Sequence, residues 1–134
     1  MRRKEIHMAR CHGDSPIQVQ DVCTISSTVV RVSGPIGSQS ILVLQPTSQF
    51  PAPTFTALAS DSLGSSGQGQ ATSLDGQTYG TISESVSTPA VVQSIAGTGS
   101  IAVLTVKLNS GLVVQVPANA CSTSNSGGTA LGSI

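Results

Sequence analysis

Four side chains near the N-terminus, His7, Cys11, His12 and Cys23, are of the types that bind zinc. His7 and Cys11 would share one face if this segment were helical, and soft thiolate and imidazole groups suit structural zinc. Their spacing matches no standard zinc module, and a translation start at Met8 would remove His7. We therefore predict that the protein has no metal site and interpret these side chains as chance ligands on a flexible arm.

Nucleophilic catalysis requires a base beside a serine or a cysteine. No histidine stands after position 12, and Lys107 lies in an alternating segment that points it to solvent. From residue 32 onward the only acids are Asp61, Asp75 and Glu84, and nothing in their spacing brings two carboxylates together. Both aspartates stand in turn-like contexts, where the side chain caps its own backbone. We therefore predict a protein that is not an enzyme, with no catalytic residue and no cofactor.

Two glycine-rich stretches, Gly64–Gly69 and Gly97–Gly99, could in principle cradle a phosphate. A phosphate-binding loop leads directly into a helix, and neither stretch does so. We interpret both as turns.

The N-terminus is basic, because Arg2, Arg3, Lys4 and Arg10 are offset locally by Glu5 alone. Such an arm could bind nucleic acid or an acidic protein surface. No aromatic residues are interleaved with it, and the rest of the chain adds no basic patch. We therefore disfavour nucleic acid and predict that these four residues contact a protein partner or solvent.

The composition restricts what kind of protein this is. The chain has 134 residues, a formal net charge of zero and 9% charged residues, against roughly 25% in an average soluble domain. That length suits one domain, and low charge favours association because little repulsion keeps copies apart. The many β-branched residues argue against disorder. Three cysteines at wide spacing do not suggest a disulfide framework, which fits a reducing compartment.

Several short segments have the pattern of β-strands. Residues 17–20 alternate, residues 24–33 are rich in β-branched residues, and residues 54–59 form another candidate strand. The continuous apolar run Ile41–Leu44 predicts a strand buried on both faces. Phe50 and Phe55 flank Pro51–Pro53 and are predicted to anchor a stiff loop. Residues 60–77 form a long polar loop.

The second half of the chain has clearer turn signals. Residues 79–87 alternate and are followed by Pro89, which is predicted to break the strand. Residues 91–116 are predicted to form a three-stranded meander that turns at Gly97–Ser100 and at Asn109–Gly111, since glycine supplies the left-handed residue of such turns. No internal repeat is evident, and no amphipathic helix is found in the body.

These elements predict an all-β fold, a small antiparallel β-sandwich or barrel with an extended N-terminal arm and C-terminal tail. The predicted arm covers residues 1–16, the β-domain 17–117 and the tail 118–134. Leu131 and Ile134 are apolar residues at the end of a polar tail, and we predict that they contact a partner. No secretory signal and no membrane-spanning run is found.

The β-rich, charge-poor stretch Val32–Val116, with its apolar-tipped tail, resembles small virion proteins of tailed bacteriophages, the capsid cement or decoration proteins. This resemblance implies a homotrimer or larger assembly that binds a major capsid protein and stabilises the shell by bridging its subunits. It also implies that the protein is made in the host cytoplasm and resides in the virion.

Two alternatives remain open. A tail or head–tail connector subunit has a similar composition but usually carries a helix and a ring-forming surface. A carbohydrate-binding or adhesin-like β-module belongs to another class, and it would favour exposed aromatic residues, of which Tyr79 is one candidate.

Overall fold

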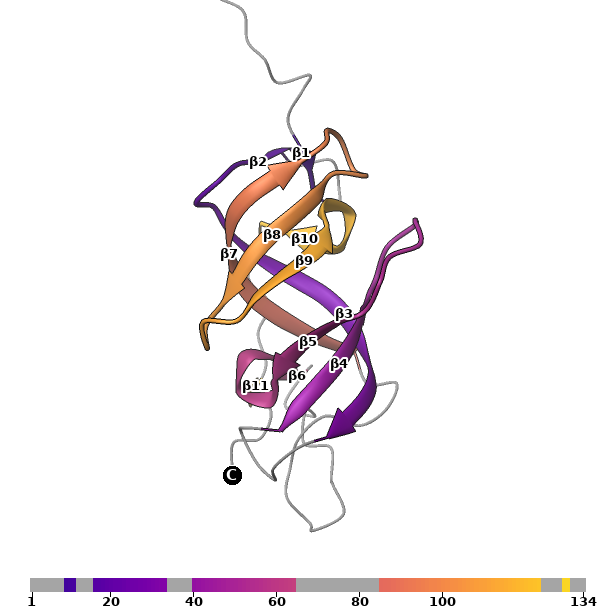
Figure 1. Ribbon diagram of the computed structural model, residues 1–134, viewed down its shortest axis with the longest axis vertical. Coiled ribbons are helices and arrows are strands. Elements are labelled where there is room, and N and C mark those ends of the chain that lie inside the picture. Colours follow the sequence, from indigo (N-terminus) through magenta and orange to yellow (C-terminus); the bar gives the residue numbers. More distant parts are fainter. Residues whose placement is uncertain (1–8, 12–15, 34–39, 65–84, 124–128, 131–134) are drawn as a thin grey trace, which may run out of the picture.

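The computed structural model describes residues 9–11, 16–33, 40–64, 85–123 and 129–130. Most of these residues build an antiparallel sheet that coils into a nearly closed small barrel, and residues 9–10 and 16–17 form a separate two-stranded sheet (Figure 1). The predicted all-β fold is therefore confirmed. Within these ranges, no helix is long and apolar enough to cross a membrane.

Eleven strands and two short 3-10 turns make up the described structure. The strands are β1 (Ala9–Arg10), β2 (Pro16–Ile17), β3 (Val22–Ser33), β4 (Ile41–Pro46), β5 (Phe55–Leu58), β6 (Leu63–Gly64), β7 (Ser85–Ala96), β8 (Val103–Leu108), β9 (Val113–Pro117), β10 (Cys121–Ser122) and β11 (Thr129–Ala130), and the 3-10 turns are η3 (Ala59–Asp61) and η5 (Ala118–Ala120).

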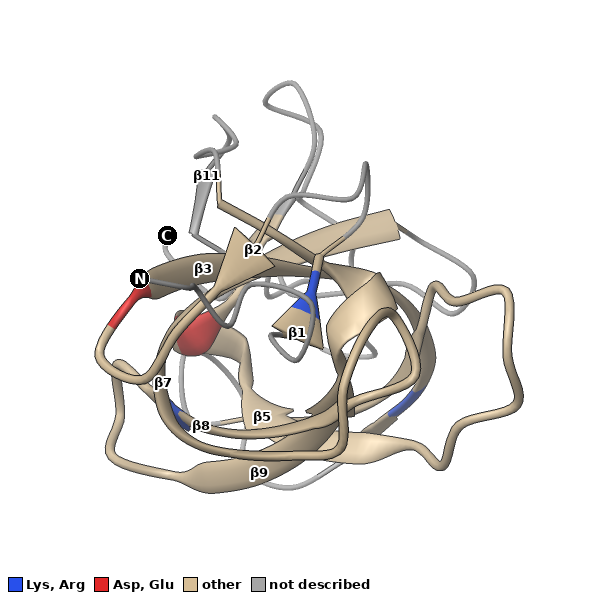
Figure 2. Ribbon diagram, turned by 90° about the horizontal axis from the view of Figure 1, so that it is seen from above, with Lys and Arg blue, Asp and Glu red and all other residues tan. Residues whose placement is uncertain are grey.

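The barrel wall has the strand order β5-β4-β3-β7-β8-β9, and every hydrogen-bonded pair in it is antiparallel. The first and last strands of this order, β5 and β9, contact each other where the sheet coils round. We call this line of contact the seam. Seen from above, the strands surround the barrel interior (Figure 2).

The barrel consists of two halves with the same topology. The first half (residues 22–64) contains β3, β4, β5, η3 and β6, and the second half (residues 85–122) contains β7, β8, β9, η5 and β10. The short last strand of each half pairs with the long first strand of the other half, because β6 pairs with β7 and β10 pairs with β3. The two halves are therefore interlocked.

The registers of the two halves agree in detail. The pairing of β3 with β4 shifts between Val29 and Arg31, and that of β7 with β8 shifts between Val92 and Ser94. Each bulge falls at the ninth residue of a strand of twelve. A bulge bends its strand and increases the local twist, which lets one long strand serve two parts of the wall. This repeat is not evident in the sequence, because the two halves share burial pattern and register rather than residue identity.

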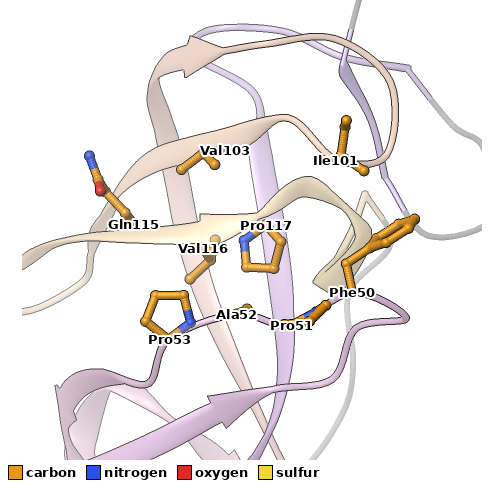
Figure 3. Close-up of a pocket in the computed structure, with 9 residues that line it drawn as sticks. All are labelled: Phe50, Pro51, Ala52, Pro53, Ile101, Val103, Gln115, Val116 and Pro117. Atoms are coloured by element: carbon orange, nitrogen blue, oxygen red, sulfur yellow. The ribbon is translucent and has the colours of Figure 1, made fainter.

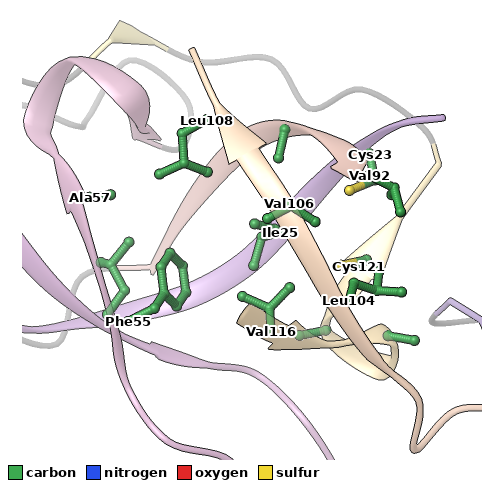
Figure 4. Close-up of a cluster of buried hydrophobic side chains, with 14 of the residues drawn as sticks. Cys23, Ile25, Phe55, Ala57, Val92, Leu104, Val106, Leu108, Val116 and Cys121 are labelled. Atoms are coloured by element: carbon green, nitrogen blue, oxygen red, sulfur yellow. The ribbon is translucent and has the colours of Figure 1, made fainter. Parts of the chain in front are cut away.

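The core lies inside the barrel and is made of small and medium aliphatic side chains. Fully buried members from both halves include Ile25, Leu42, Leu44, Leu104 and Val106. Figure 4 shows how side chains from β3, β5, β7, β8 and β9 converge there. Alternate residues point inward, as expected for a sheet with one buried face.

The run Ile41–Leu44 follows the same alternation, so the prediction of burial on both faces was wrong. Leu42 and Leu44 are buried, Val43 is half-buried and Ile41 is exposed. Ile41 and Val43 are aliphatic although they point to the outer face of β4. A continuous apolar run in this strand therefore does not mean that both of its faces are buried.

The predicted meander over residues 91–116 is confirmed, because β8 pairs with β7 and β9 pairs with β8. Gly97 and Gly111 have positive φ angles of 94° and 100° in the two turns. A Cβ atom at Gly97 would also lie 3.4 Å from the Ala102 Cα. Glycine is favoured at both positions because other residues would be strained there.

Pro89 does not break its strand, contrary to the prediction. It lies inside β7, between Ser87, which pairs with Leu63 of β6, and Ala90, which pairs with Leu108 of β8. One edge of β7 changes partner at this point, and a residue without an N–H group is best tolerated at such an interruption of a ladder.

The first predicted strand, residues 17–20, is also different in the structure. Only Pro16–Ile17 is a strand, and the chain turns immediately afterwards. The Gln18 N–H donates to the Asp21 Oδ2 at 2.9 Å, and Gln20 has a φ angle of 79°. The side-chain bond therefore stabilises a turn where a strand was expected.

Residues on both sides of the predicted domain boundaries pack on the barrel. Ala9 and Cys11 are buried, and β1 pairs with β2. After Pro117 the chain continues through η5 into β10, and Ala118, Ala120 and Cys121 are buried. These parts of the predicted arm and tail have no core of their own, and they bury their small side chains against the barrel.

Candidate functional site

Most of the predicted interface residues, Arg2, Arg3, Lys4, Leu131 and Ile134, lie outside the described residues, as do His7, His12, Asp75, Tyr79 and Glu84. Arg10 is described and lies half-buried in β1, where its backbone N–H donates to the Gly99 carbonyl at 3.0 Å. Most of the predicted loop 60–77 is also outside the described ranges. The predicted interface through the arm and tail therefore stays a prediction.

Asp61 has a structural role, as the sequence predicted. Its Oδ2 accepts hydrogen bonds from the Leu58 N–H at 3.0 Å and from the Ser110 hydroxyl at 2.6 Å, and its Oδ1 accepts one from the Ser110 N–H at 2.8 Å. Lys107 is exposed on β8, as expected. The buried carboxylate of Asp61 thus joins η3, which follows β5, to the turn between β8 and β9.

An equivalent bond joins the opposite end of the seam. The Asn119 Oδ1 in η5 accepts a hydrogen bond from the Gln49 N–H at 2.9 Å. Each 3-10 turn therefore uses one side chain to bind the backbone of the other half. The segment that it binds is the linker between the second and third strands of that other half. We call these two bridges the clasps. Among the described residues, no strand pairing joins β5 to β9 between them.

An apolar groove of about 270 Å³ lies on the barrel surface at the seam. Its walls are the linker before β5 on one side and β8 and β9 on the other (Figure 3). The lining residues carry no charge and are Phe50, Pro51, Ala52, Pro53, Ile101, Val103, Gln115, Val116 and Pro117.

The groove exists because the two linkers differ. The linker between β4 and β5 spans residues 47–54, whereas the equivalent linker between β8 and β9 spans only residues 109–112. The longer linker is held by the Gln45 side chain, whose Nε2 donates to the Ala52 carbonyl at 2.8 Å. Pro51 and Pro53 restrict its backbone further. The linker therefore forms a fixed wall of the groove.

Large apolar side chains are exposed at and near the groove. Ile101 is 66% exposed, Val113 is 56% exposed, and Phe50 and Val103 are each 40% exposed. Phe55 is buried, which fits its predicted role as an anchor of the loop, whereas the predicted anchor Phe50 is partly exposed at the groove. Charged side chains are sparse over the described surface (Figure 2). Contiguous apolar surface of this kind commonly marks a site of protein contact.

The three cysteines, far apart in sequence, are all buried in the described structure and all carry free thiols. Cys11 follows β1, Cys23 lies in β3 and Cys121 begins β10. Among the described residues, no group of three or more His, Cys, Asp or Glu side chains is arranged to hold a metal ion.

No protein family, curated protein or solved structure matches the chain. Its function therefore has to be inferred from the groove, the clasps and the surface around them.

Sequence inspection did not find the groove residues. Phe50–Pro53 was visible as a stiff loop, but its contact with β9 depends on how the sheet closes. The signal available in the sequence was an aromatic residue beside two closely spaced prolines in a long inter-strand linker, which is typical of a fixed surface loop.

Proposed function

We propose that this chain is a non-enzymatic structural protein of a virion, a capsid cement or decoration protein that stabilises the shell by bridging major capsid subunits. It would act through its surfaces as a homotrimer or larger assembly, and its site of action would be the particle rather than the host cytoplasm where it is made.

The observation that carries this proposal is the uncharged apolar groove at the seam. Covering an apolar surface with a partner removes it from water, which lowers the free energy of the complex. Ile101, Val103 and Phe50 offer such a surface on a rigid frame, since strands form one wall and a proline-restrained linker forms the other. A preformed site loses little conformational entropy when it binds.

The seam also supplies backbone groups for association. β5 and β9 each have one hydrogen-bonded neighbour in the described structure, β4 and β8 respectively. A strand edge without a ladder partner is a template for pairing with another chain. The composition, with few charges to protect edges, is consistent with a protein whose edges meet other subunits.

Sedimentation velocity of the purified protein over a wide concentration range tests the assembly. We expect a trimer or larger species, and Val103→Asp in the groove should shift it toward monomer because a charge would be buried in the contact. Val30→Asp is the matched control, since Val30 is also exposed (43%) but lies on β3, away from the groove. A compact monomer at every concentration would contradict the proposal and favour a small binding module.

The virion assignment has a separate test. Particles purified from the virus that encodes the chain should contain it at a copy number comparable to that of the major capsid protein. If the protein self-associates but is missing from the particles, the assembly is real and the virion assignment is wrong.

A further inference from the structure

Two of the buried thiols lie beside each other across a strand pair. β10 pairs with β3 in the register Cys121 to Ile25 and Ser122 to Thr24. Residues two apart on a strand point to the same face, so Cys23 and Cys121 are diagonal neighbours on the inner face. Figure 4 shows both side chains together at one end of the core. This proximity was not visible in the sequence, where 97 residues separate them.

The two thiols have different surroundings, because the Cys121 thiol donates a hydrogen bond to the Pro117 carbonyl, 3.8 Å from the Cys121 Sγ. The ability of the neighbouring Cys121 thiol to donate a hydrogen bond lowers the pKa of Cys23, while burial and the charge of Asp21 oppose this change. The same interaction with Cys23, followed by burial, raises the pKa of Cys121. The lowered pKa favours Cys23 as the thiol that forms the thiolate.

Cys11 completes the cluster but differs from the pair. Burial, followed by the charges of Cys23 and Asp21, raises the pKa of Cys11 to about 12. Because the thiolate is the reactive form, Cys11 is expected to be inert at neutral pH. It provides an internal control.

The other half of the barrel shows that thiols are not needed for packing at such a junction. There, β6 pairs with β7, and the buried hydroxyls of Ser62 and Thr88 are 2.9 Å apart. In the junction between β10 and β3, Cys121 takes the place of Ser62 and lies opposite Ile25, and Cys23 takes the place of Val86. The same connection is thus made once with side chains that resist oxidation and once with side chains that can be oxidised.

We propose that Cys23 and Cys121 form a peroxide-reactive dithiol that closes to an intramolecular disulfide and fixes β10 to β3. This modification site is independent of the proposed structural function. Cys23 acts as the nucleophile and Cys121 as the resolving thiol.

The reaction is balanced with hydrogen peroxide as the oxidant. The Cys23 thiolate attacks one peroxide oxygen and expels hydroxide, leaving a sulfenic acid on Cys23. The Cys121 sulfur then attacks the Cys23 sulfur and expels the sulfenic oxygen as a second hydroxide. The two hydroxides take up the two thiol protons and leave as water. Two thiols and one peroxide thus give one disulfide and two waters, with sulfur oxidised and oxygen reduced.

Closing the bond requires a small movement of the backbone. Diagonal positions on paired strands are typically roughly 7–8 Å apart, whereas a disulfide favours a Cα separation of roughly 4.4–6.8 Å. β10 has only two residues and follows a short 3-10 turn, so it can shift without moving the long strands. Both thiols are buried, and we therefore expect oxidation to be slower than that of an exposed thiol.

Peptide mapping of the full-length protein tests the proposal. The reduced protein is treated with hydrogen peroxide, unfolded and alkylated, and then cleaved after Arg10, Arg31 and Lys107. We expect residues 11–31 and 108–134 to be recovered as one linked product, with the mass of the two peptides less two hydrogens and with Cys11 alkylated. Recovery of the two peptides unlinked after peroxide treatment would overturn the proposal.

Single substitutions identify the partner of Cys121. Cys11→Ser should still form the linked product, whereas Cys23→Ser should lose it entirely. A link that persists in Cys23→Ser would assign the bond to Cys11 and contradict the proposal. The oxidised wild-type protein should also have a Tm several degrees higher than the reduced protein, and a dithiol reductant should reverse the shift. This measurement does not depend on the folding of any variant.

Discussion

The two halves of the barrel share strand lengths, bulge positions and interlocking short strands, yet they differ in two places. The linker between the second and third strands has eight residues (47–54) in the first half and four (109–112) in the second. Only the longer linker carries exposed Phe50 and the groove. Topology that is common to both halves serves folding, and the departures from it are where the proposed binding groove and the proposed dithiol lie.

The second departure concerns the junctions between the halves. Ser62 and Thr88 meet at one junction, and Cys23 and Cys121 meet at the other. Both junctions are buried, so packing alone does not distinguish them. Cys121 and Cys23 stand where the other junction has Ser62 and Val86, so only the junction of β10 with β3 can form a disulfide.

The largest expected effect tests the shared core. Leu42 and Leu104 occupy equivalent register positions and are fully buried. Leu42→Ala and Leu104→Ala should each lower the free energy of unfolding by about 2–5 kcal/mol, because a cavity replaces buried aliphatic atoms. Urea denaturation of the two variants checks this. Unequal losses, with one below about 1 kcal/mol, would show that the halves do not contribute equally to one core.

The clasps should differ in strength although each joins a 3-10 turn to the linker of the other half. Asp61 accepts three hydrogen bonds and Asn119 accepts one, from Gln49. We expect Asp61→Ala to cost about 2–3 kcal/mol and Asn119→Ala about 1 kcal/mol, since bonds to a charged acceptor are stronger and leave more buried donors unpaired when lost. Thermal unfolding at neutral pH measures both. Equal losses would mean that the carboxylate charge adds nothing.

The buried Cys11 thiol should make the stability of the fold sensitive to alkali. Burial raises the pKa of the Cys11 thiol from 9.0 to about 12, so the unfolded chain loses this proton at lower pH than the folded chain. Its contribution to stability is therefore complete below about pH 9 and is lost as pH rises from about 9 to 12. Cys11→Ala should reduce the decline in Tm over this range. An unchanged decline would show that Cys11 is not its source.

The smallest effect on stability is expected at the groove. Phe50→Ala should change the free energy of unfolding by less than about 0.5 kcal/mol, since Phe50 is exposed and is not part of the barrel core. The same substitution should weaken self-association in sedimentation experiments. A large loss of stability would instead identify Phe50 as a structural anchor of the linker.

Local signals in the sequence predicted the local parts of the fold. Alternation and the glycine at position 111 identified the β7-β8-β9 meander, because a turn and its two strands are adjacent in the chain. Pro89 was misread because its tolerance depends on a change of partner from β6 to β8 along the far edge of β7. No single-segment pattern contains that information.

The candidate site depends on contacts between distant residues. Phe50 meets Pro117 at the groove, and Cys23 meets Cys121 at the core's end, only once the sheet has coiled. The internal repeat was equally invisible, since equivalent positions such as Val30 and Gln93 share a bulge but not a residue type. Register, not identity, relates the halves.

The exchange of short strands between the halves has a consequence for the origin and engineering of this barrel. Each half lends its last strand, β6 or β10, to the other, so neither half completes its own sheet. Two identical copies of one half would satisfy the same exchange about a true twofold axis. The barrel is thus equivalent to a fused dimer, and a chain severed between residues 64 and 85 should reassemble from its two pieces as a split-protein pair.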